Sequence, residues 1–125
     1  MSRNAQAYRR VAVESASPVR VLDELYARLL LDCDRAKQAI VEKRIADKGM
    51  AISHGLQIVD ELAAAVDVKV APELGSNLLR LYDFCRERLV FANLKLDTNA
   101  LEEACNIIAI LRQAFAEATG EGRAP

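Results

Sequence analysis

The sequence lacks tryptophan altogether, and aromatic residues make up only 5% of its 125 residues. It also lacks the strict apolar–polar alternation of β-strands and has no glycine-rich loop of the kind that binds phosphates. Apolar residues nevertheless reach 52%, and alanine and leucine dominate among them, which is typical of helical bundles. A chain of this length fits one domain and can bury a core without disulfides or metals.

Neither sign of charge is in excess, because 17 Lys and Arg face 18 Asp and Glu and leave a net charge of −1. This balance argues against a nucleic-acid-binding protein and against attachment to an anionic membrane surface. No apolar run approaches the ~20 residues of a membrane span. The stretch MSRNAQAYRRVAVESASP has no apolar signal-peptide core. We therefore expect a cytoplasmic protein that does not insert into membranes.

Cysteine and histidine are scarce, at three and one. Cys33, Cys85 and Cys105 show no C-x-x-C spacing and fall on the apolar stripes of the predicted helices, so we expect buried thiols. Together with His54 they match no usual zinc-ligand spacing, and free thiols suit a reducing cytosol. No serine or cysteine lies at a sequence spacing from another residue that would indicate a catalytic base for it. We expect no metal, no other cofactor and no enzymatic activity.

Apolar residues recur at steps of three and four along most of the chain, which predicts amphipathic helices. Ser17 and Pro18 suit the N-cap and first position of the first helix. Asp97, Thr98 or Asn99 can cap the last helix, which Gly120 ends. The predicted helices span about 18–42, 44–66, 73–95 and a last segment that ends near 118.

Short connections between long helices favour antiparallel neighbours. The predicted fold is therefore all-α, an antiparallel four-helix bundle over residues 17–119. A flexible N-terminal arm of residues 1–16, with Tyr8 as its only aromatic residue, precedes the bundle. Residues 120–125 read as a disordered tail.

Several helices carry more apolar residues than one core-facing stripe requires. In LYDFCRERLVFANLKLD, Phe84 and Phe91 lie off the main stripe, and Val90 and Leu94 lie on a third side. Small and apolar residues also alternate around Gly55 in the second helix, which predicts a groove for another helix. Contiguous exposed apolar patches usually mark binding sites. The candidate partner-binding residues of the bundle are Ile58, Leu62, Phe84, Phe91, Ile107 and Ile110.

The order of motifs resembles the family of the flagellar secretion chaperone FliS. The matching pieces are AYRRVAVESASP, VLDELYARLL, LQIVDEL, LLRLYDFCRERLVFANLKLD and LEEACNIIAILRQAF. The resemblance covers residues 7–118 in the right order and spacing. Tyr8 matches the recurrent tyrosine of the family's arm, and Tyr82 and Asn93 belong to its third-helix motif.

The resemblance implies a cytoplasmic bundle without catalytic activity that binds the disordered C-terminal segment of flagellin in apolar surface grooves. Binding would prevent premature polymerisation and aid delivery to the flagellar type III export apparatus, whose gate is a further expected partner. It also implies that the arm folds over a groove until flagellin displaces it, so Tyr8 joins the candidate binding residues. We expect a monomer or a weak dimer.

Two other functions fit parts of the sequence. His54 points away from the main stripe of its helix, and an exposed histidine on a four-helix bundle can accept a phosphoryl group. The run SHGLQI, however, lacks the lysine that usually follows such a histidine. A self-associating structural bundle, in which the surplus apolar surface pairs with itself, is the other alternative.

Overall fold

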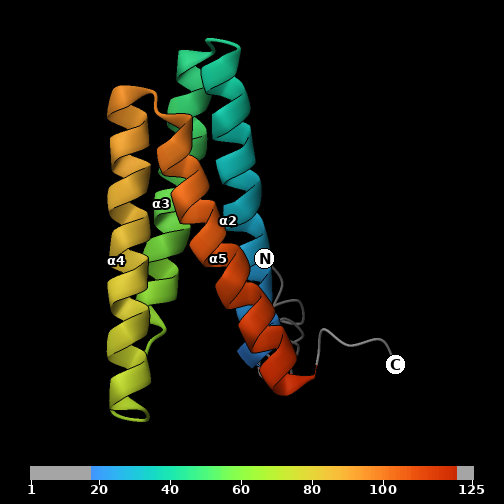
Figure 1. The fold of residues 1–125 in the computed structure, drawn as a ribbon, viewed down its shortest axis with the longest axis vertical. Helices are drawn as coiled ribbons and strands as arrows, with labels where there is room; N and C mark the ends of the chain where they lie inside the picture. The colour runs from blue at the N-terminus through green and yellow to red at the C-terminus, as the bar shows by residue number, and fades with distance from the viewer. Residues whose placement is uncertain (1–17, 121–125) are drawn as a thin grey trace, which may run out of the picture.

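The structure is a computed structural model and describes residues 18–120. Four helices make up this part of the chain, and no strand occurs in it (Figure 1). Their bounds lie within two residues of those expected from the sequence, so the all-α four-helix prediction is confirmed. The helices are α2 (Pro18–Val41), α3 (Ile45–Ala64), α4 (Pro72–Lys95) and α5 (Thr98–Thr119).

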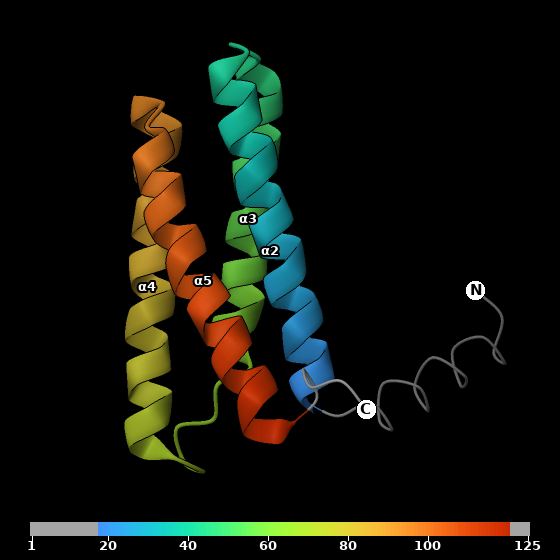
Figure 2. The ribbon, with the colours of Figure 1, turned by 45° about the vertical axis from the view of Figure 1, so that its right-hand side comes forward.

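Each helix packs against two others, in the cyclic order α2, α3, α4, α5 and back to α2. Consecutive helices run antiparallel because their connections are short. The helix α5 begins beside the end of α4 and ends beside the start of α2, so it crosses the bundle obliquely (Figures 1 and 2). The second half of α5 therefore diverges from α4.

The turn between α4 and α5 shows how local sequence fixes a helix boundary. Asp97 is the N-cap of α5, and its carboxylate accepts hydrogen bonds from the backbone N–H groups of Asn99, at 2.8 Å, and Ala100, at 3.3 Å. Of the three capping candidates, Asp97 is thus the one used. Leu96, just before it, takes a left-handed conformation with φ 53°. Gly120 ends α5 at φ 76°, as expected for a C-terminal glycine.

The core lies on the common axis of the four helices. The hydroxyls of Tyr26 and Tyr82 meet there at 2.6 Å and tie α2 to α4 inside the bundle. Cys33 and Cys85 are buried as expected, whereas Cys105 is only partly buried. The largest fully buried side chains are Tyr26, Leu29, Cys33, Ile52, Val59, Leu62, Cys85, Leu89, Leu101 and Ile108.

The prediction of a surface groove on α3 is wrong, because most of the residues around Gly55 that were expected to line it face the core. Ile58 is 3% exposed and Leu62 is 1% exposed. A Cβ atom added to Gly55 would lie 3.3 Å from Cδ1 of Leu29 on α2 and 3.9 Å from Cδ1 of Leu89 on α4. The small residue thus makes room for neighbours within the chain, and α2 and α4 fill the space expected for a partner.

Candidate partner-binding surface

The side of α4 that faces α5 carries a partly exposed apolar strip. We call it the α4/α5 seam and define it by Phe84, Arg88 and Phe91 of α4 with Ile107 and Ile110 of α5. Phe84 is 37% exposed and Ile110 is 67% exposed. Phe91 and Ile107 are half-buried and pack against the core. The seam continues the core outward and leaves its outermost side chains in water.

Helical periodicity explains why the seam lies on this side. The buried residues Tyr82, Cys85 and Leu89 turn inward from α4. Phe84 and Phe91 are seven residues apart, so they share one flank about 100° away from Cys85. That flank faces α5, because Arg88 between the two phenylalanines pairs with an α5 side chain. Phe84 and Phe91 therefore lie on the flank of α4 that α5 borders.

Arg88 lies over the aromatic part of the seam. Its guanidinium carbon is 4.6 Å from the centre of the Phe91 ring and 5.9 Å from that of Phe84. Its terminal nitrogens approach Glu103 of α5 at 3.5 Å and Glu87 at 3.7 Å. Arg88 thus covers part of two rings with a charged group, an attractive cation–π arrangement.

The Nε atom of Arg88 is buried without a hydrogen-bond partner. A buried donor in this state is costly, so the covering position of Arg88 is not its most favourable hydrogen-bonding state. Sequence reasoning missed this residue. Its signal was its position four residues after Phe84 and three before Phe91, where side chains of a helix share a face.

Four of the seven predicted binding residues lie on the adjoining helices α4 and α5. Phe84 and Phe91 belong to α4, and Ile107 and Ile110 belong to α5. The other two from the bundle, which are Ile58 and Leu62, are core residues of α3. Tyr8 lies outside the described residues.

The opposite flank of α4 is different in character. A hollow of about 420 Å³ lies between α3 and α4. Both polar and apolar side chains border it, and Arg86 of α4 bonds Asp60 of α3 across it at 2.6 Å. The third side of α4 carries Val90 and Leu94, which are exposed as expected. The seam is the flank of α4 on which aromatic residues gather.

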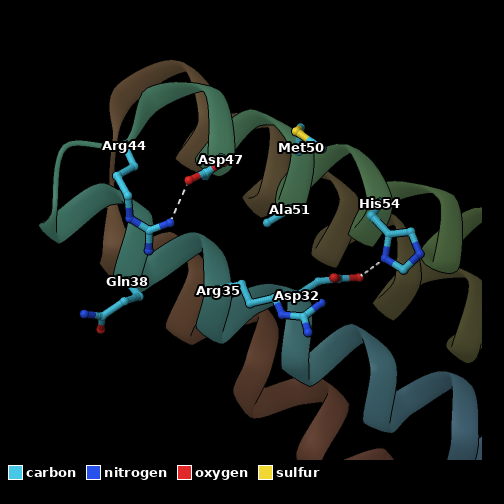
Figure 3. Close-up of a pocket in the computed structure, with 8 residues that line it drawn as sticks. All are labelled: Asp32, Arg35, Gln38, Arg44, Asp47, Met50, Ala51 and His54. Atoms are coloured by element: carbon cyan, nitrogen blue, oxygen red, sulfur yellow. Dashed lines mark hydrogen bonds and ion pairs between the residues drawn. The ribbon is translucent and has the colours of Figure 1, made fainter.

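A second hollow, of about 640 Å³, lies between α2 and α3 (Figure 3). There the Nδ1 atom of the exposed His54 is 2.5 Å from a carboxylate oxygen of the buried Asp32. Arg44 and Asp47 form an ion pair of 2.7 Å at the other end (Figure 3). The sequence predicted an exposed His54 but gave no sign of Asp32 beside it.

Burial raises the pKa of several groups in the core. It is the largest cause of the raised pKa of Tyr26 and Tyr82. It also raises the pKa of Cys85 to about 12. These groups stay protonated at neutral pH and serve packing and hydrogen bonding.

Clusters of metal-ligating side chains and membrane-spanning helices are both absent from residues 18–120. In this part of the chain, no three His, Cys, Asp or Glu side chains gather closely enough to hold a metal ion. None of the helices there is both long and apolar enough to cross a membrane.

The fold and the seam together define a class: a four-helix bundle that presents a partly exposed apolar strip, as expected of a protein-binding helical protein. Comparisons with known proteins give the family. Residues 1–122 match the family described as flagellar protein FliS. The chain belongs to this family of flagellar secretion chaperones.

Curated relatives agree with this assignment. The Salmonella typhimurium protein named flagellar secretion chaperone FliS is 32% identical over 115 residues, which are 88% of this chain and 85% of that protein. Flagellar secretion chaperone FliSB of Pseudomonas aeruginosa is 32% identical, with 81% of this chain and 83% of that protein covered. A crystal structure of a flagellar chaperone from bacteria superposes with a TM-score of 0.80 at 14% identity. It covers 94% of this chain and 98% of that one, a likeness of fold.

Proposed function

We propose that this protein binds the disordered C-terminal segment of flagellin through the α4/α5 seam. The relatives named flagellar secretion chaperones point to a flagellar substrate. The single observation that carries the choice of surface is the exposure of Phe84 and Ile110 on adjoining helices. A partner that covers them removes apolar area from water, at about 25 cal/mol per Å².

The chemistry of the seam suits an amphipathic segment that is unfolded before it binds. Such a segment loses conformational entropy on binding, so it needs a long apolar contact surface to compensate. The seam supplies a line of branched and aromatic side chains along two helices. Arg88 within the seam and its neighbours Glu87 and Glu103 supply polar contacts at the rim.

A bound segment cannot assemble with other flagellin molecules through the same apolar residues. We infer that binding takes place in the cytoplasm, prevents premature polymerisation and keeps the segment in a form that the flagellar type III export apparatus accepts. The chaperone acts by binding and needs no catalytic residue or cofactor for this. Tyr8 of the N-terminal arm remains a predicted contact.

The experiment is calorimetric titration with a peptide of the flagellin C-terminal segment, at two or more temperatures. We expect a negative heat-capacity change for the wild type, because apolar area is buried. Ile110→Asp should weaken binding about tenfold or more, since it places a charge in the contact. Val41→Asp is the matched control: Val41 is 70% exposed, like Ile110, but lies at the end of α2. Equal loss in both variants, or no binding by the folded wild type, contradicts the proposal.

The alternative of histidine phosphotransfer through His54 has one favourable observation. The Asp32 carboxylate beside Nδ1 can orient the ring, as a carboxylate does for a catalytic histidine. Family membership favours the chaperone. Incubation with a small-molecule phosphoryl donor such as acetyl phosphate separates the two, with His54→Gln as the control. We expect no acid-labile phosphate on either protein, and His54-dependent labelling would support phosphotransfer.

A further inference from the structure

Cys33 of α2 and Cys105 of α5 lie at the same level of the bundle. Two ion pairs fix how α2 and α5 align: Lys37 with Glu102 at 3.2 Å, and Asp23 with Arg112 at 2.7 Å. Cys33 is one helical turn before Lys37, and Cys105 is one turn after Glu102. In this antiparallel alignment the two cysteines are near enough for hydrogen bonding between their thiols to shift the pKa of both.

The two thiols are chemically unequal. Cys33 is buried, whereas Cys105 is partly exposed, so a small reagent in solvent reaches Cys105 first. The hydrogen bond from Cys33 lowers the pKa of Cys105, and Lys37 acts in the same direction. Burial and the carboxylates of Asp34 and Glu102 oppose this effect but do not outweigh it. The same hydrogen bond, followed by burial, raises the pKa of Cys33.

We propose that Cys105 and Cys33 form a dithiol that hydroperoxides convert into a disulfide between α2 and α5. The Cys105 thiolate attacks one oxygen of hydrogen peroxide, the O–O bond breaks, and a sulfenic acid and a hydroxide ion form. The Cys33 sulfur then attacks the Cys105 sulfur and displaces the hydroxyl group. The proton of Cys33 leaves with it as water. In sum, two thiols are oxidised, one peroxide is reduced, and two water molecules are produced.

Each thiol has the position its step requires. Thiolate character and access select the residue that a peroxide oxidises, and of the two cysteines Cys105 has the lower pKa and the greater exposure. The resolving thiol must be adjacent rather than exposed, which describes Cys33.

The third cysteine provides a control within the chain. Cys85 of α4 is also buried in the core, but its thiol approaches the backbone carbonyl of Ala104, at 3.9 Å between sulfur and oxygen. Burial raises its pKa to about 12, so it reacts poorly as a thiolate at neutral pH. The proposal therefore requires that Cys85 stays reduced when the other two are oxidised.

A disulfide at this position closes a loop that contains all of α3 and α4. A bond across so long a loop restricts the unfolded chain and stabilises the fold. We expect oxidation to raise the melting temperature and a thiol reductant to reverse the rise. This redox response does not depend on which partner the seam binds.

The test is a non-reducing peptide map of the full-length protein after hydrogen peroxide treatment at neutral pH. We expect a Cys33–Cys105 disulfide in the wild type and in Cys85→Ser, and no disulfide in Cys33→Ser or Cys105→Ser. A sulfenic acid trap should label Cys105 most strongly in Cys33→Ser, which lacks the resolving thiol. A disulfide that includes Cys85, or three thiols that stay reduced, would overturn the proposal. The wild-type map decides this even if a variant fails to fold.

Discussion

A row of residues around Gly55 on α3, which includes Ile58 and Leu62, carries the same signal in the sequence as the α4/α5 seam. In the structure the row on α3 is buried, whereas the seam is partly exposed. Both are apolar residues beyond the main stripe of a helix. On α3, the neighbours α2 and α4 enclose that row, and Gly55 lets the Leu29 side chain approach. On α5, Ile110 lies on the side of the helix away from the buried Ala104 and Ile108, and it is 67% exposed. Surplus apolar residues therefore indicate a binding surface only where the folded bundle leaves them uncovered.

The largest expected difference between the two regions is in stability. Leu62→Ala removes a side chain that is 1% exposed and leaves a cavity. We expect it to lower the free energy of unfolding by about 2–5 kcal/mol. Ile110→Ala should change it by less than about 0.5 kcal/mol, the usual range for an exposed site. Urea unfolding followed by circular dichroism measures both, and equal losses would erase the distinction between the two regions.

The ionisable groups of the core provide the second contrast, which appears at alkaline pH. Cys85 has a pKa of about 12 in the folded chain, against about 8.5 for an unfolded cysteine. Between these two pH values the unfolded chain binds fewer protons than the folded chain. The free energy of unfolding must therefore fall as pH rises. The contribution of Cys85 to the free energy of unfolding is fully present below about pH 8.5. Above that pH it decreases by up to ~1.4 kcal/mol per pH unit.

Cys85→Ala tests this dependence directly, because it removes the titrating group. We expect the difference in unfolding free energy between wild type and variant to narrow steadily from pH 8.5 to 10.5. Urea unfolding at several pH values measures it. If the unfolding free energies of wild type and Cys85→Ala stay parallel as pH rises, Cys85 has no raised pKa in the folded protein.

A smaller effect should come from Arg88, which covers the rings of the seam. Arg88→Ala removes the cation–π contacts with Phe84 and Phe91, at a cost of about 0.5–2 kcal/mol. It also exposes more of both rings, so we expect brighter fluorescence from an apolar-surface dye. Arg86→Ala is the control, because Arg86 pairs with Asp60 on the other flank of α4. An equal increase in both variants would mean that Arg88 does not cover the seam.

The smallest effect is expected at the edge between α2 and α5. Arg112 makes two hydrogen bonds to Asp23, at 2.7 and 3.3 Å, but both side chains are substantially exposed. Solvent screens such a pair, so Arg112→Ala should cost about 0.2–1 kcal/mol. The cost should shrink further at high salt. A loss as large as that of Leu62→Ala would place Arg112 with the core instead.

The helices could be predicted from the sequence because their signals are local. Three- and four-residue apolar spacing, a capping carboxylate at Asp97 and a glycine at position 120 act within a few residues. The exposure of an individual side chain depends on how the helices cross. Ile58 and Ile110 both lie beside the apolar stripe that the sequence indicates, but Ile58 is 3% exposed and Ile110 is 67% exposed in the folded bundle.

Contacts between residues on different helices could not be predicted from the sequence either. The approach of Asp32 to His54 and that of Arg88 to Glu103 depend on the alignment of neighbouring helices. The alignment of Cys33 with Cys105 is of the same kind. Each contact needs the relative shift of two helices to within about one turn, which a single sequence does not encode visibly.

The most direct test of the seam is a methyl NMR titration of the isoleucine-labelled protein with the flagellin C-terminal peptide. Ile107 and Ile110 lie in the seam, Ile58 lies in the core, and Ile45 is exposed at the start of α3. We predict that the methyl signals of Ile107 and Ile110 shift most on binding, while those of Ile58 and Ile45 change little. Large shifts at Ile45 or Ile58 with unchanged signals at Ile110 would contradict the assignment of the seam as the binding surface.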